Sequence, residues 1–122
     1  MIDFHTHILP GMDDGSRDCA QTLAMLREMA RQGVDTAVAT PHFYRRENTP
    51  AAFLERRARS YALLRPHLTP ELPRLLLGAE AAFFPGMAQA EDTALLCIEN
   101  TRTLLVEMPC RPWGRAVPAE LA

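Results

Sequence analysis

Short apolar runs alternate with helical segments along this chain, and this alternation narrows the possible folds more than any other feature of the sequence. The apolar runs have the length and the alternating or β-branched character of strands. They cover residues 2–8, 34–40, 75–78 and 103–106, with a possible short extra strand at 95–98. Strands separated by helices predict βαβ units, and therefore an α/β fold with a parallel sheet or barrel.

Two helices are expected between these strands, and residues 118–122 read as the start of a third. Ser16 or Asp18 can cap the first helix, and Gly33 suits the turn after it. The second helix begins with a Thr-Pro pair at residues 49–50, an N-cap followed by proline at the first helical position. Its apolar stripe is expected to hold Phe53, Leu54, Ala58, Tyr61 and Leu64. Its solvated face is expected to carry Arg56, Arg57 and Arg59.

Composition limits the classes of function. A chain of 122 residues is one domain in size, and its net charge of -2 gives no electrostatic reason to expect nucleic acid or an anionic membrane as a partner. No apolar run approaches the roughly 18 residues that cross a bilayer, and the first residues lack the pattern of a signal peptide. We therefore expect a cytoplasmic protein without membrane insertion. Its cysteines are expected to be reduced, since no Cys-x-x-Cys pair is present among Cys19, Cys97 and Cys110.

Metal-competent side chains gather where the predicted strands end. His5 and His7 are two residues apart on the first strand, so both imidazoles leave the same face. The next three apolar runs end at His42, Glu80 and Glu107. The carboxyl ends of parallel strands meet at one edge, where active sites of α/β folds are built. The alternative is that these residues are ordinary surface side chains at strand ends.

Two aspartates, Asp13 and Asp14, lie in the loop after the first strand and would reach the same edge. Either can instead bond the backbone of an Asp-Gly turn, and we take Asp14 as the candidate ligand. Imidazoles mixed with carboxylates suit Mn²⁺, Fe or Zn²⁺ better than Ca²⁺. Two or three such ions would activate water and neutralise phosphoryl oxygens, which favours hydrolysis of a phosphate ester.

The run of residues 5–15, HTHILPGMDDG, resembles the opening of the PHP-type tyrosine phosphatases that serve bacterial capsule and exopolysaccharide synthesis. The segments ATPH at 39–42, GAE at 78–80 and LVEMP at 105–109 continue the resemblance in order and cover essentially the whole chain. The resemblance implies a manganese-dependent enzyme that removes phosphate from phosphotyrosine on the tail of a tyrosine autokinase. By the same resemblance the metal ligands are His5, His7, Asp14, His42, Glu80 and Glu107.

The resemblance also implies the architecture. Members of the family have a distorted (β/α)7 barrel and are about twice as long as this chain, with a further histidine, an arginine and an Asp-x-His in their second half. This sequence has no histidine after His67 and no Asp-x-His. We therefore expect residues 1–122 to form a single, incomplete PHP domain, about half of the barrel. Beyond the metal ligands no catalytic residue is expected within it, and homo-oligomers are possible.

Other functions were weighed against this one. A cysteine-based tyrosine phosphatase needs an arginine six residues after its cysteine, but those positions hold Met25, Thr103 and Ala116, which excludes that mechanism. The same His-x-His strand also opens amidohydrolases and other PHP phosphoesterases, such as those acting on histidinol phosphate. A truncated, non-catalytic fragment is a third alternative; its uncovered apolar surface would favour self-association.

Overall fold

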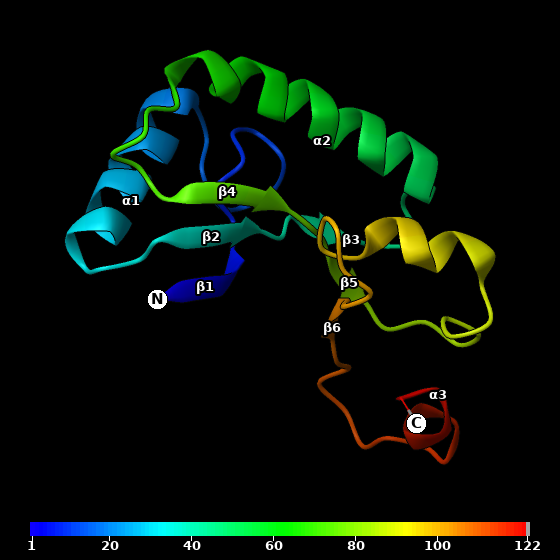
Figure 1. Ribbon diagram of the computed structural model, residues 1–122. Coiled ribbons are helices and arrows are strands. Elements are labelled where there is room, and N and C mark those ends of the chain that lie inside the picture. Colours follow the sequence, from blue (N-terminus) through cyan, green and yellow to red (C-terminus); the bar gives the residue numbers. More distant parts are fainter. Residues whose placement is uncertain (122) are drawn as a thin grey trace.

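Strands and helices alternate along the chain, as the sequence predicts (Figure 1). The structure is a computed structural model and describes residues 1–121. Its elements are, in chain order, β1 (Ile2–Thr6), α1 (Cys19–Arg31), β2 (Thr36–Ala39), β3 (His42–Phe43), α2 (Pro50–Leu64), the 3-10 helix η1 (Arg65–His67), β4 (Arg74–Leu77), β5 (Glu80–Ala82), the 3-10 helix η2 (Glu91–Leu96), β6 (Leu105–Glu107) and α3 (Ala116–Leu121). Residue 122, the last of the predicted third helix, lies outside the described part.

The strands form two small sheets. One has the order β1-β2-β4 and the other the order β3-β5-β6, and every strand pair among the described residues is parallel. The predicted α/β class with parallel strands is therefore confirmed. The second sheet sets His42 opposite Glu80 and Ala82 opposite Glu107 in register. This register brings His42, Glu80 and Glu107, which are far apart in the sequence, together in the second sheet.

The two long helices begin as the sequence predicts. Asp18 caps α1 by accepting a hydrogen bond from the backbone N–H of Gln21, and Thr49 caps α2 by accepting one from Ala52. Ser16, the alternative cap of α1, is buried, and its hydroxyl lies 2.7 Å from that of Thr22. Both caps satisfy backbone donors that have no partner within the helix.

The predicted faces of α2 are partly wrong. Ala58 is exposed, whereas Ser60 is buried and its hydroxyl donates a 2.7 Å hydrogen bond to the carbonyl of Pro10. Arg57 leaves the solvated face, because its guanidinium donates to the carbonyl of Gly78 at 2.7 Å and lies over the ring of Phe53. The helix therefore presents polar donors, as well as apolar side chains, to the strands.

The strand predicted at 34–40 is present as β2, but β3 after it is not predicted, and one other strand prediction is wrong. The run 34–40 and the three residues after it give two strands, β2 and β3, because Pro41 has no N–H and the Thr40 hydroxyl accepts a hydrogen bond from Thr6. The possible strand at 95–98 is wrong, since residues through Leu96 belong to η2. A four-residue apolar run does not distinguish strand from helix, and the acidic residues Glu91 and Asp92 in the first turn favour a helical start.

The hydrophobic core lies between α1, α2 and the strands. Its largest buried side chains include Ile8, Leu26, Phe43 and Phe53, and the last two pack edge to face with ring centroids 5.3 Å apart. No helix among residues 1–121 is both long and apolar enough to cross a membrane.

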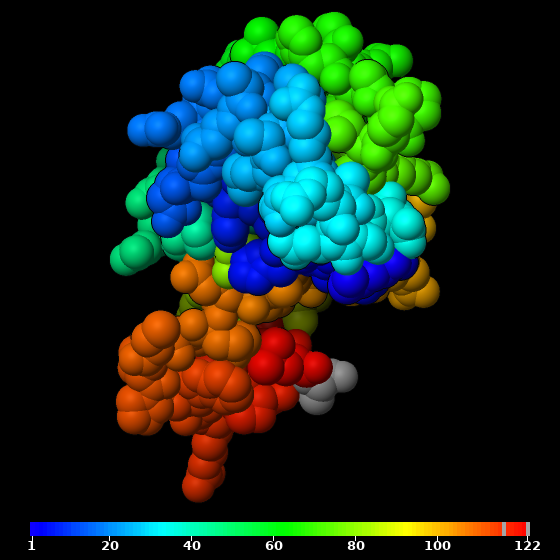
Figure 2. All heavy atoms as spheres, turned by 90° about the vertical axis from the view of Figure 1, so that its left-hand side faces the viewer, coloured from blue at the N-terminus to red at the C-terminus, as the bar shows by residue number. Residues whose placement is uncertain are grey.

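The described part also leaves apolar surface uncovered. Ile2 and Phe4 of β1 are about half exposed, and β1 pairs only with β2 among the described residues. In Figure 2 the dark blue residues of β1 lie on the lower surface of the main body, and the orange and red C-terminal segment projects below it. Strand β1 is therefore an edge with exposed apolar side chains.

Candidate metal centre

The structure brings the six predicted ligands to one edge of the strands. His5 lies in β1 and His7 follows that strand directly, while His42 and Glu80 begin β3 and β5 and Glu107 ends β6. The parallel register His42↔Glu80 places two of these side chains next to each other. Asp14 comes from the loop between β1 and α1. Imidazoles and carboxylates from four strands and one loop thus meet within a few ångströms.

The first group of donors is His5, His7 and Glu80. The Nε2 atoms of the two histidines lie 3.2 Å apart, and Glu80 Oε2 lies 3.0 Å from His5 Nε2 and 3.1 Å from His7 Nε2. Glu80 is buried, with 8% of its surface exposed. Three donor atoms with this spacing can surround a single metal ion.

Asp13 fixes the orientation of His7. Its Oδ2 atom lies 2.9 Å from His7 Nδ1 and accepts a hydrogen bond from the backbone N–H of His42, while Oδ1 accepts one from Gly15. Burial raises the pKa of Asp13, but the hydrogen bonds from His42, Gly15 and His7 outweigh it and lower the pKa overall. An ionised Asp13 holds a proton on His7 Nδ1 and leaves Nε2 with a free lone pair, the form that binds metals.

The second group is formed around His42. Its Nε2 lies 3.6 Å from Asp14 Oδ1, and its Nδ1 lies 3.4 Å from Glu80 Oε2 and 3.6 Å from Glu107 Oε2. The rings of His7 and His42 stack with centroids 4.5 Å apart. Asp14 is largely exposed, with 83% of its side chain accessible. His42 therefore links the Asp14 side of the cluster to the glutamate side.

Tyr44 closes one side of the cluster. Its ring stacks on His42 with centroids 5.5 Å apart, and its hydroxyl lies 3.2 Å from His42 Nδ1. Burial and the carboxylates of Glu107, Glu80 and Asp14 raise the pKa of Tyr44, so the phenol stays protonated at neutral pH. The aromatic ring limits the positions that the His42 imidazole can take.

The donor chemistry fits divalent metals. Three overlapping sets of side chains have ligand atoms within 4.8 Å of one another, namely His7/Asp13/Asp14/His42, His5/His7/Glu80 and His42/Glu80/Glu107. Glu107 Oε2 is buried without a hydrogen-bond partner, and a bare buried carboxylate oxygen is costly unless a cation or donor meets it. Imidazole nitrogens and carboxylate oxygens about 3 Å apart fit around an ion with bonds of about 2.0–2.2 Å.

The backbone beneath the cluster needs glycine at one position. A Cβ on Gly15 would lie 2.1 Å from the carbonyl oxygen of His7 and 2.4 Å from its Cβ, closer than any real contact. The Ser16 N–H donates to the same His7 carbonyl at 2.9 Å. Loop and ligand are therefore packed directly against each other at this glycine.

Two residues of the site were not predicted in the roles that they have here. The sequence leaves Asp13 open as a turn residue or as a weaker ligand candidate than Asp14; it does bond the Gly15 N–H, but it also orients His7. A signal was present, because a buried acid close to a histidine ligand is a common partner. Tyr44 lies two residues after His42, a spacing that can place both side chains on one face, but the sequence does not specify that the two rings stack. His67 is exposed at the end of η1.

Parallel strands with a histidine and carboxylate cluster at one edge define an α/β protein with a candidate metal centre. The family model described as capsular polysaccharide synthesis, CpsB/CapC, matches residues 1–117. The chain belongs to this CpsB/CapC family.

Individual relatives agree with this assignment. The chain is 36% identical over 113 residues to the tyrosine-protein phosphatase YwqE of Bacillus subtilis, covering 89% of this chain and 43% of YwqE. It is 48% identical over 42 residues to the tyrosine-protein phosphatase CpsB of Streptococcus pneumoniae, covering 34% of this chain and 17% of CpsB. A solved structure from a study of these two proteins, described as metal-dependent tyrosine phosphatases, matches with a TM-score of 0.74 and 32% identity.

The matched structure is longer than this chain. The alignment covers 98% of this chain and 49% of the solved one, so this chain spans about half the length of its structural relative.

Proposed function

We propose that this chain supplies a metal-binding half of a metal-dependent phosphotyrosine phosphatase. The observation that carries the proposal is the meeting of three overlapping His/Asp/Glu donor sets at one edge of parallel strands. The relatives YwqE and CpsB are named tyrosine-protein phosphatases, which supports the reaction class. Their names also favour a phosphotyrosine substrate over histidinol phosphate or an amide.

The ligands proposed are the six side chains predicted from the sequence, His5, His7, Asp14, His42, Glu80 and Glu107. Glu80 would contribute to two ions, because its carboxylate lies near both His5 and His42. We propose two or three divalent ions, with Mn²⁺ preferred and Fe or Zn²⁺ as alternatives. Bound divalent ions supply a more acidic water and neutralise charge on phosphoryl oxygens.

The chain's own side chains prepare this site. Asp13 holds the His7 imidazole with its Nε2 toward His5 and Glu80. Tyr44 stacks on His42 and fixes the plane of that ring. A cavity of about 400 Å³ opens beside Asp14 and His42, and Arg56 on its wall carries a positive charge that suits a phosphate group.

The architecture proposed is about half of a distorted (β/α)7 barrel of the PHP type, with residues 1–122 as one incomplete domain. The half-length match to the solved relative supports this proposal. A further strand would pair with the free edge of β1, and the exposed side chains of Ile2 and Phe4 would pack against the added part.

The biological substrate proposed is phosphotyrosine on the tail of a bacterial tyrosine autokinase that controls capsule or exopolysaccharide synthesis, in the cytoplasm. The family description, capsular polysaccharide synthesis, supports this setting. The substrate itself is taken from the family resemblance.

The test measures metal binding and activity separately. Calorimetric titration with Mn²⁺ should show binding to the chain, which His42→Ala reduces at least tenfold and the surface control His67→Ala leaves unchanged. Release of phosphate from a phosphotyrosine peptide and from histidinol phosphate should then be compared, for the chain alone and with the C-terminal half of YwqE added. Equal binding by both variants would reject the metal site, and preference for histidinol phosphate would reject the proposed substrate.

A further inference from the structure

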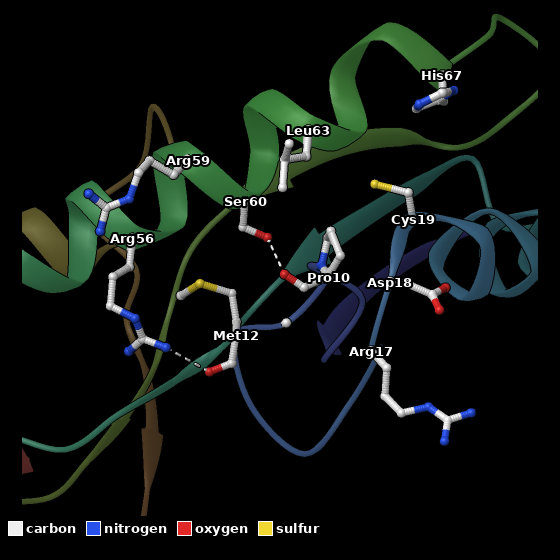
Figure 3. Close-up of a pocket in the computed structure, with 11 residues that line it drawn as sticks. Pro10, Met12, Arg17, Asp18, Cys19, Arg56, Arg59, Ser60, Leu63 and His67 are labelled. Carbon is white, nitrogen blue, oxygen red and sulfur yellow. Dashed lines mark hydrogen bonds between the residues drawn. The ribbon is translucent and has the colours of Figure 1, made fainter.

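An open cavity of about 640 Å³ lies between the loop that follows β1, the start of α1 and the face of α2 that carries Ser60 and Leu63 (Figure 3). The loop contributes Pro10 and Met12, and α2 contributes Ser60 and Leu63. The Ser60 hydroxyl donates to the Pro10 carbonyl at 2.7 Å, as the dashed line in Figure 3 marks. The floor of the cavity is thus held in place by a buried side chain on α2.

The charge of this cavity is positive, although the chain as a whole has a net charge of -2. Three arginines line it, Arg17, Arg56 and Arg59, against one acid, Asp18. One carboxylate oxygen of Asp18 already accepts the helix-capping hydrogen bond from Gln21. Arg59 pairs with Glu55, but both side chains are about two-thirds exposed, and exposed pairs of this kind are weak.

The cavity adjoins the smaller cavity beside the candidate metal centre. Arg56 and Met12 line both this cavity and the smaller one that holds Asp14 and His42. The Arg56 guanidinium donates to the Met12 carbonyl at 3.1 Å, so the arginine stands at the boundary of the two cavities. A substrate peptide with one residue at the metal centre would pass Arg56 before it reached Arg59 and Arg17.

We propose that this cavity binds an acidic peptide segment that flanks the phosphotyrosine of the substrate. The proposal rests on the proposed phosphatase function and names the kind of sequence that it prefers. Charge complementarity with the arginines selects aspartate and glutamate side chains. The exposed apolar side chain of Leu63, 66% of whose surface is accessible, accommodates the hydrophobic part of such a segment.

Binding of labelled peptides tests the proposal without requiring catalysis. Three fluorescein-labelled peptides of equal length are titrated with the Mn²⁺-loaded chain and followed by anisotropy. One has phosphotyrosine with acidic flanks, one has phosphotyrosine with glutamine and serine flanks, and one has unmodified tyrosine with acidic flanks. Acidic flanks should tighten binding about fivefold, whether or not the tyrosine is phosphorylated, and the gain should decrease at high salt.

Paired variants locate the effect. Arg17→Gln combined with Arg59→Gln should remove the fivefold gain and leave binding of the neutral-flank phosphopeptide unchanged. The control, Arg27→Gln with Arg102→Gln, changes the net charge by the same amount at exposed sites outside the cavity and should keep the gain. No gain from acidic flanks, or equal loss in both double variants, would overturn the proposal. If acidic flanks tighten binding but the two acidic peptides, with and without phosphate on the tyrosine, bind equally well, the cavity is supported and the proposed phosphatase function is rejected.

Discussion

At the scale of single residues, the site depends on side chains that hold the ligands as much as on the ligands themselves. Asp13 is the example, since its carboxylate is shared between the ring of His7 and the backbone of His42 and Gly15. Such partners determine which imidazole nitrogen faces the metal.

We therefore expect Asp13→Asn to weaken Mn²⁺ binding by about ten- to a hundredfold, because the amide lacks the charge that keeps the proton on His7 Nδ1. Isothermal titration calorimetry measures the change. Asp92→Asn, which alters an exposed partner of Arg45, is the matched control and should bind Mn²⁺ normally. An unchanged affinity for Asp13→Asn would show that His7 is oriented by other contacts.

A second prediction concerns Gly15, whose Cα lies against His7. Gly15→Ala adds a methyl group 2.1 Å from the His7 carbonyl oxygen, so the loop must move. We expect a loss of about 1–3 kcal/mol of folding stability and weaker metal binding. Gly114→Ala, where an added Cβ meets nothing within 4 Å, should change neither. Urea denaturation and Mn²⁺ titration of both variants test this, and wild-type behaviour of Gly15→Ala would contradict it.

At the scale of elements, helix α2 is attached to the strands by a polar contact as well as by packing. The Arg57 guanidinium donates to the Gly78 carbonyl, two residues before the candidate ligand Glu80. Burial lowers the pKa of Arg57, but the shifted group remains a cation at any physiological pH. The end of β4 is thereby fixed to the helix.

Arg57→Met should cost about 1–3 kcal/mol, because it leaves the Gly78 carbonyl without its partner. Arg59→Met, two residues away on the same helix and exposed, should cost no more than about 0.5 kcal/mol. Chemical denaturation of the two variants compares them directly. Similar losses in both would mean that the inward position of Arg57 contributes nothing to stability.

The elements also show how far the sequence can be used to predict this fold. Caps, long helices and the first buried strands were predicted because capping residues and apolar periodicity are local signals. The short strands β3 and β5 were not predicted, since two or three residues give no periodicity and their pairing is long-range. Arg57 was misplaced because its acceptor, the Gly78 carbonyl, comes from a distant strand.

The candidate site was easier to predict than the strands that form it. All six candidate ligands lie in the cluster, because five of them lie in or next to a strand, Asp14 lies in the loop after β1, and parallel strands bring such positions to one edge. Their role as ligands stays a prediction. The surrounding contacts of Asp13 and Tyr44 depend on loop geometry and ring stacking, which the sequence does not specify.

At the scale of the whole molecule, we expect metal binding to be coupled to folding. Ligands from four strands and a loop come together only in the folded chain, so an ion that binds them stabilises that state. At 100 times its dissociation constant, Mn²⁺ should add about 2.7 kcal/mol to the free energy of unfolding.

Differential scanning fluorimetry measures the thermal midpoint with and without Mn²⁺. His67→Ala should keep the increase in the thermal midpoint and His42→Ala should lose most of it, because His42 lies in the cluster and His67 does not. EDTA should reverse the increase in the wild-type chain. A midpoint that does not respond to Mn²⁺ would argue against a metal centre in this chain.

The parallel register of β3, β5 and β6 also has a consequence for synthesis on the ribosome. His42 meets Glu80 across β3 and β5, and Glu107 enters only with β6, so no short stretch of the nascent chain contains the complete cluster. Pairing of such distant segments is slow compared with helix formation. The donor side chains of the candidate metal centre can therefore all come together only after Glu107 has left the exit tunnel.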